Sequence, residues 1–196
     1  MKKKSFSGIN LLMAVIILLA LGCEPIYIPD PIDPRLPKYS QSGNNVAGAL
    51  INDTLWESRY FRQPFIAADQ PTVAYTEDRD TLVFTFRGNM DNDPYGTFIS
   101  FGMRHTGVFN LQSMTQLNDT KYPLGTAENG ARYGSAACIQ TASNGQLYCR
   151  SVKYDEENHY ITLSGTFSFT VSDPLCGDKA VTYGRFDFRI SSIQFF

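Results

Sequence analysis

The chain has few of the residue types from which catalytic and metal sites are usually built. Among its 196 residues there are two histidines, His105 and His159, and four cysteines. Each histidine stands alone in a polar, turn-like stretch, which argues against a histidine base and against a histidine metal site. No cysteine pair has the short spacing of a zinc site, and neither a Gly-x-Ser-x-Gly nor a His-Glu-x-x-His motif occurs. We therefore expect no enzyme activity, no cofactor and no bound metal.

Clusters of positive charge are missing beyond the first few residues. Residues 1–22 hold three of the 17 basic residues and no acidic residue, so the rest of the chain has 14 basic and 19 acidic side chains, a net charge of −5. Nucleic acids and anionic membrane surfaces both reward clustered Lys and Arg. The composition therefore argues against both as partners.

The one acidic run in a turn does not complete a calcium-binding loop. Asp91, Asn92 and Asp93 resemble the start of such a loop. Tyr95 then takes the third ligand position, and no acidic residue ends the loop. A solvated hairpin turn containing Pro94 is the favoured interpretation.

The longest apolar run lies at the N-terminus and has the form of an export signal. Leu11 to Leu21 is unbroken and apolar after a basic start, and Gly22 leads into Cys23. The run is shorter than the roughly 20 apolar residues that span a bilayer. Its end resembles a lipobox, after which a diacylglycerol is attached to the cysteine, although Ala20 stands where Leu is usual. The resemblance predicts a signal peptide over residues 1–22 and a lipidated Cys23; the alternative is an ordinary signal peptide with an incidental cysteine.

Lipid on Cys23 would hold the protein on a membrane, because each buried methylene contributes about 0.8 kcal/mol and two or three acyl chains make attachment stable. By resemblance to lipoprotein sorting rules, an Asp after the cysteine favours retention in the inner membrane, and Glu24 does not match it. We expect a cell-envelope protein anchored in the outer membrane, with the periplasmic or surface side left open.

A proline-rich segment follows the cysteine. Residues 24–45 contain half of the ten prolines of the chain. Proline fixes φ and lacks an N–H, so the segment is expected to be extended. Glu24 to Lys38 would then form a spacer of roughly 45 Å at about 3.1 Å per residue, and Ser40 to Asn45 a flexible joint. These features predict a lipidated linker over residues 23–45; a proline motif for a partner domain is the alternative.

Residues 46–196 have the length of one domain and an apolar pattern with period two. No stretch keeps a helical apolar stripe over three turns, and Asn, Asp, Gly and Pro signals separate the runs. This pattern predicts a single all-β domain, an antiparallel β-sandwich or open barrel. The clearest alternating runs place these side chains on one face: Leu82, Phe84 and Phe86; Ile161, Leu163, Gly165, Phe167, Phe169 and Val171; Phe186, Phe188 and Ile190.

Three segments of the domain resemble a known family. They are GALINDTLWES at residues 48–58, ITLSGTFSFT at 161–170 and VTYGRFDFRI at 181–190. The domain is similar to an uncharacterised family of Gram-negative lipoproteins, known by a domain of unknown function, that begins with a hairpin ending in Trp and ends with a Gly-Arg-Phe-Asp strand. The resemblance implies a β-sandwich lipoprotein and brings no catalytic residues. The residues themselves predict that Trp56 anchors the core and that Gly165 and Gly184 permit close strand packing.

Three cysteines remain besides Cys23, enough for one disulfide in an exported protein. A four-residue loop over Ala142–Gly145 would place Cys138 directly opposite Cys149, within disulfide reach. A two-residue turn at Asn144-Gly145 would not, and Cys176 is the competing partner for either cysteine. We predict the bridge Cys138–Cys149.

Two sequence features bear on a ligand. Tyrosines such as Tyr95, Tyr133 and Tyr148 could stack on sugars, although tyrosine is also common on a half-wet sheet. The segments Asp53–Leu55 and Asp80–Leu82 resemble an O-glycan acceptor motif, and entry from a turn into a strand explains both equally well. The sequence therefore predicts a non-catalytic binding or interaction module with an envelope protein or glycan as partner. The alternatives are a glycan-binding accessory protein of an uptake system and a hydrolase with paired carboxylates in a cleft.

Overall fold

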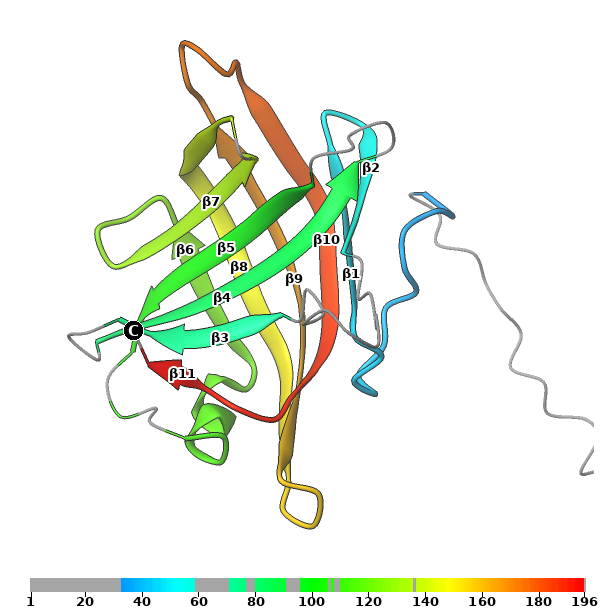
Figure 1. The fold of residues 1–196 in the computed structure, drawn as a ribbon, viewed down its shortest axis with the longest axis vertical. Helices are drawn as coiled ribbons and strands as arrows, with labels where there is room; N and C mark the ends of the chain where they lie inside the picture. Colours follow the sequence, from blue (N-terminus) through cyan, green and yellow to red (C-terminus); the bar gives the residue numbers. More distant parts are fainter. Residues whose placement is uncertain are drawn as a thin grey trace, which may run out of the picture. The chain divides into compact units, whose positions relative to one another are not determined.

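The computed structural model describes most of the chain after residue 32 (Figure 1), and residues 32–196 form one compact unit. The predicted signal peptide, Cys23 and Glu24 lie outside the described residues, as do the Asp91–Asp93 run and Tyr95. In the described part, no helix is long and apolar enough to cross a membrane. The described ranges are 33–58, 71–76, 80–90, 96–105, 107, 110–135 and 137–195.

Within these ranges the secondary structure is almost entirely strand, as the period-two pattern predicts. One short 3₁₀ helix, η1 (Ser113–Leu117), interrupts the series between β5 and β6. The strands are β1 (Val46–Ile51), β2 (Thr54–Ser58), β3 (Thr72–Tyr75), β4 (Thr81–Met90), β5 (Thr97–Arg104), β6 (Thr120–Leu124), β7 (Asn129–Ser135), β8 (Ile139–Asp155), β9 (Tyr160–Val171), β10 (Lys179–Ile190) and β11 (Gln194–Phe195).

Eight strands close into a ring. Its order is β4-β2-β1-β10-β9-β8-β7-β5, and β5 pairs with β4 to complete it. All of these neighbours are antiparallel, and closure gives each of the eight ring strands a partner on both sides. Outside the ring, β3 pairs with β4, β11 pairs in parallel with β3, and β6 pairs with β8. The predicted all-β antiparallel class is confirmed, in the form of a closed barrel-like sheet.

Aromatic side chains fill the interior of the ring. The alternating phenylalanines of β4, β9 and β10 point inward, together with Phe101 of β5, and each is at most 3% exposed. Their rings pack with centroids between 4.7 Å, for Phe86–Phe188, and 6.5 Å, for Phe186–Phe188. Edge-to-face and offset contacts at these distances stabilise a core beyond its buried area. The described interior is therefore a solid core rather than a ligand chamber.

The predicted anchor residue and the two glycines have the expected roles. Trp56 is fully buried, and its indole Nε1 donates a hydrogen bond to Thr97 Oγ1 at 2.8 Å. A Cβ at Gly165 would overlap the Tyr148 carbonyl oxygen, and one at Gly184 would come within 2.6 Å of the Phe167 ring. The missing side chain lets the Tyr148 backbone approach Gly165 and lets the Phe167 ring approach Gly184.

The predicted disulfide is wrong. Cys138 pairs with Cys176 across a Cα–Cα distance of 6.4 Å, and Cys149 is a buried free thiol. The prediction required a hairpin turn near Asn144-Gly145, but β8 continues through these residues and only a bulge occurs between Ala142 and Asn144. Cys138 and Cys149 therefore lie at separate points along one extended segment, roughly 35 Å apart at about 3.3 Å per residue.

Residues 36–45, named the strap here, lie against the outside of the ring. Leu36 is 4% exposed and packs with Leu50 and Leu55. Pro37 lies so close to Gly48 that a Cβ there would overlap the proline ring. At the other end, Asn45 Oδ1 accepts a hydrogen bond from the Arg189 backbone N–H at 2.9 Å. The segment Ser40–Asn45, expected to be a flexible joint, is thus bound to β10.

Candidate functional site

The described surface has a trough on the outside of β4, β5 and β7. Strand pairing aligns Val83, Gly102 and Gly130 in one row across it. The next row aligns Thr85, Ser100, Arg132 and Thr141. The trough has a volume of about 360 Å³.

Two glycines make this part of the sheet hollow. A Cβ at Gly130 would meet no atom within 4 Å, and one at Gly102 would touch only Thr81 Cγ2 at 3.6 Å. Neither glycine is needed for close packing, in contrast to Gly165, so side chains are missing here where the fold would accept them. The β6–β7 turn forms one wall, and the Arg104 backbone N–H holds it by donating to the Glu128 carbonyl at 3.0 Å.

Hydroxyl groups are the most frequent polar groups in the lining of the trough. Its lining includes four threonines and Ser100, with Glu128 and Arg132 as its charged side chains. Thr85 Oγ1 and Ser100 Oγ lie 3.0 Å apart and share a hydrogen bond at its edge. Hydroxyls both donate and accept, so this lining suits a polar, largely uncharged ligand. The trough has neither paired carboxylates nor a histidine beside a hydroxyl, which are the groups that the hydrolase hypothesis requires.

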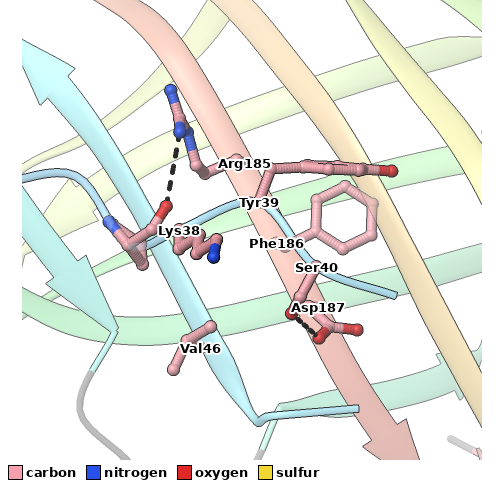
Figure 2. Close-up of a pocket in the computed structure, with 8 residues that line it drawn as sticks. Lys38, Tyr39, Ser40, Val46, Arg185, Phe186 and Asp187 are labelled. Carbon is pink, nitrogen blue, oxygen red and sulfur yellow. Dashed lines mark hydrogen bonds between the residues drawn. The ribbon is translucent and has the colours of Figure 1, made fainter. Parts of the chain in front are cut away.

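A second polar feature lies where the strap crosses β10 (Figure 2). Asp187 is 1% exposed, although its alternation with Phe186 and Phe188 places it on the outer face of the ring. Its carboxylate accepts hydrogen bonds from three backbone N–H groups and one hydroxyl, and all four donors belong to the strap. These are Ser42 N at 3.2 Å, Gly43 N at 2.9 Å, Asn44 N at 3.1 Å and Ser40 Oγ.

The recess beside Asp187 is a packing contact rather than a ligand site. In Figure 2, Ser40 meets Asp187 and the Arg185 side chain reaches back to the strap. Arg185 donates to the Pro37 carbonyl at 3.4 Å. The space between these groups does not admit a molecule of the size of water. Asp187 therefore fixes the strap to the sheet, because a carboxylate bound by several N–H donors is strongly held.

Of the tyrosines proposed to stack on sugars, Tyr133 and Tyr148 do not share a surface, and Tyr95 lies outside the described residues. Tyr133 points inward, is 8% exposed and donates from its hydroxyl to Met90 Sδ at 3.2 Å. Tyr148 is on the outer face of β8, where its hydroxyl donates to Asp119 Oδ1. That hydrogen bond is the largest cause that raises the pKa of Tyr148. Tyr133 therefore faces the core and Tyr148 faces the outside, so these two rings do not form one stacking surface.

The three cysteines among the described residues offer no reactive site. Cys138, Asp173 and Cys176 have ligand atoms within 4.8 Å of one another, but the disulfide occupies both sulfurs. Burial raises the pKa of the Cys149 thiol to about 12, so this thiol stays protonated and inert at neutral pH.

Both glycan-acceptor-like segments lie at the start of a strand. Asn52 and Asp53 have positive φ angles of 47° and 64° in the β1–β2 turn, and Thr54 begins β2. Asp80 precedes β4 and accepts a hydrogen bond from Thr81 Oγ1 at 2.9 Å. Positive φ angles account for the residue types in the first segment, and a side-chain hydrogen bond accounts for Asp80 in the second.

Comparison with known proteins adds no identification: no protein-family model, curated protein or solved structure matches the chain. Sequence reasoning did not single out Asp187, Gly102 or Gly130. In the sequence, the alternation around Asp187 predicts a solvent-exposed side chain, and the two glycines only interrupt the alternating pattern of their strands. The Ser-Gly-Asn-Asn stretch of the strap, rich in residues that form N–H-lined turns, is the one signal for a buried anion partner.

Proposed function

We propose that this chain is an envelope lipoprotein, held in the outer membrane by lipid on Cys23, whose β-domain is a non-catalytic binding module. The export signal and Cys23 support the anchor. The solid phenylalanine core supports the binding-module part, because it moves any small-molecule site from the interior of the ring to its outer surface.

The trough is the surface to which we assign binding. Its volume of about 360 Å³ falls in the range of about 300–1,000 Å³ typical of small-molecule sites. Its floor is open because Gly102 and Gly130 lack side chains that the space would accept. Open floor and hydroxyl lining together are the observation that carries the proposal.

A glycan is the second, more specific candidate, with the protein acting as an accessory of an uptake system. The lining of Thr76, Thr81, Thr126, Thr141 and Ser100 favours it, because sugars present neutral hydroxyls that exchange hydrogen bonds with such groups. The trough lacks an aromatic ring among its lining residues, so a sugar would bind without the stacking platform that strengthens many sugar sites.

A binding screen of glycans and envelope proteins against the mature chain tests the proposal. The decisive variant is Gly130→Val, which fills the trough floor at a position where a Cβ would meet no atom within 4 Å. Thr166→Val is the matched control, because Thr166 is a half-exposed residue of β9 that does not line the trough. We expect a hit that Gly130→Val weakens at least tenfold and Thr166→Val leaves unchanged. A hit that survives Gly130→Val would move the binding surface elsewhere.

The anchor needs its own test. Cys23→Ser should release the protein from membranes or leave the signal uncleaved, because the lipid attaches to the Cys23 sulfur. Membrane fractionation and intact mass decide this. Normal membrane association of the variant at the mature mass would contradict the lipid anchor.

A further inference from the structure

The outer face of β6, β8, β9 and β10 gathers positive charge that the net charge of the chain conceals. Six of the 14 basic residues outside the signal segment lie on this face or on the strap that crosses it. We name these residues the cationic face: Lys38, Lys121, Arg150, Lys153, Arg185 and Arg189.

Strand register places these residues side by side. Lys153 pairs with Thr162, which pairs with Arg189, so the two cations lie two strands apart. Lys121 pairs with Tyr148, Tyr148 with Thr166, and Thr166 with Arg185. At about 4.8 Å between strands, the two rows span roughly 10 and 14 Å. The cations thus form one surface rather than scattered points.

Tyrosine rings hold three of the cations against the sheet. The Arg189 guanidinium lies 4.3 Å from the centre of the Tyr160 ring, and the Arg150 guanidinium lies 5.2 Å from that of Tyr39. Lys121 Nζ lies 5.2 Å from the centre of the Tyr148 ring. Contacts over the ring face order a cation while its N–H groups can still reach an anion.

The carboxylates that face these cations have partners of their own. Asp119 accepts from Tyr148, Asp187 is buried under the strap, and Asp33 pairs with Arg35 at 2.7 Å. Asp155 accepts from Asn158 at the end of the face, with Glu156 and Glu157 exposed in the turn beyond it. No ion pair joins Arg150, Lys153 or Arg189 to a carboxylate among the described residues.

We propose that the cationic face rests on the anionic phospholipid headgroups of the membrane that holds the anchor. This step rests on the proposed lipid anchor. The strap crosses the cationic face, and nine residues separate Cys23 from Asp33. That length of chain reaches at most roughly 35 Å, so a membrane that holds the lipid would be within reach of this face. Guanidinium and ammonium groups bind phosphate, and tyrosine suits the membrane interface.

Net charge argued against such a surface, but net charge is an average over all faces. The 19 acidic residues outnumber the 14 basic ones in the chain as a whole. An approaching bilayer meets one face within a Debye length of about 8 Å at physiological salt, so local charge decides the interaction.

Vesicle sedimentation tests the proposal with the mature chain lacking lipid, residues 24–196. The probes are phosphatidylcholine vesicles with and without phosphatidylglycerol. We expect binding only to the vesicles that contain phosphatidylglycerol, and weaker binding at high salt. Because each cation near an anionic surface contributes about 1 kcal/mol, Arg150→Gln with Lys153→Gln should weaken binding about 25-fold.

The control is Arg87→Gln with Arg104→Gln, which removes the same charge from the outer face of β4 and β5. This control should bind within twofold of the unaltered chain. Absence of binding to phosphatidylglycerol vesicles, or equal loss in both double variants, would overturn the proposal. Lys153→Gln alone, at an exposed position, guards against misfolding, and thermal melts of each variant check it. Since the chain used here has no lipid, its result is independent of the Cys23 fractionation test.

Discussion

The link between the strap and Asp187 predicts a large effect from a small change. Asp187→Asn keeps the size and shape of the side chain and replaces one oxygen by an NH₂ group. In the native chain, Oδ2 accepts from Ser40 Oγ, Ser42 N and Asn44 N, while Oδ1 accepts from Gly43 N. An amide that keeps its oxygen at the Oδ2 position turns its NH₂ group toward the Gly43 N–H, donor against donor.

The magnitude follows from these four bonds. A hydrogen bond to a charged group contributes about 1.5–3 kcal/mol and a neutral one about 0.5–1.5 kcal/mol. The variant therefore loses one charged bond and weakens three, which is partly offset because no charge is then buried under the strap. We expect the free energy of unfolding to fall by about 2–3 kcal/mol, a shift of roughly 1–2 M in the urea midpoint.

Two measurements test this prediction. Urea unfolding followed by the fluorescence of Trp56, a buried reporter, gives the loss of stability. Limited trypsin digestion gives the release of the strap, through faster cleavage after the exposed Lys38. Glu156→Gln is the control, because it removes one carboxylate charge from an exposed turn. An unchanged midpoint together with unchanged cleavage after Lys38 would refute the assignment of Asp187 as the residue that holds the strap.

Three further predictions concern the core and the trough. Reducing Cys138–Cys176 should lower the free energy of unfolding by about 4 kcal/mol in the chain-entropy model for a separation of 38 residues, measured by urea unfolding; a non-reducing peptide map that links Cys138 to Cys149 would contradict the pairing. Burial raises the pKa of Cys149 from 9.0 to about 12. The stability that this residue contributes to the folded state is therefore present below pH 9 and is lost between pH 9 and 12. That loss has a slope of up to about 1.4 kcal/mol per pH unit, and Cys149→Val should flatten it in alkaline unfolding curves, whereas equal slopes would count against the assignment. Gly165→Ala should destabilise the domain by about 2 kcal/mol or more, while Gly130→Val should be neutral or stabilising by up to about 1 kcal/mol; thermal melts showing the reverse order would contradict the described packing.

The fold class could be predicted because strand pattern is a local property. In β4, Leu82, Phe84 and Phe86 are buried and Arg87 is exposed, as the alternation predicts. The same holds for the second half of β9, where Ser168 and Thr170 are exposed between buried residues. Each of these positions is decided by its immediate neighbours, so periodicity alone identifies the inner face.

The pairing of distant segments could not be predicted in the same way. Asn144-Gly145 is a turn signal, but the same freedom of backbone angle serves a bulge, and Gly145 adopts a φ of 149° inside β8. Whether these two residues form a turn or a bulge depends on whether β9 extends alongside them. In the structure β9 pairs with β8 from Ala142 to Asp155, so the chain continues as a strand. The disulfide partner followed from that choice: the loop expected over Ala142–Gly145 does not form, and Cys138 pairs with Cys176 instead of Cys149.

The candidate surfaces show a related limit. Thr162, Ser164 and Asp187 occupy outward positions yet are at most 8% exposed. The strap lies over this region, with four of its residues bound to Asp187 and Gly43 close to Thr162. Asp187 and Gly43 are 144 residues apart in the sequence, so an alternation pattern that describes only one strand cannot show what covers it.

Binding of the strap also changes how far the domain could stand from the proposed lipid anchor. An extended spacer from Glu24 to Lys38 would hold the domain roughly 45 Å from the lipid at about 3.1 Å per residue. Asp33 already begins a turn, in which it accepts the Leu36 backbone N–H at 3.2 Å, and Leu36 is buried against β1 and β2. Only residues 24–32 then remain as spacer, which shortens the reach to roughly 28 Å at the same rise. With the proposed lipid anchor, a shorter spacer would raise the effective concentration of headgroups at the cationic face, and weak contacts by single cations would then be sufficient to orient the domain.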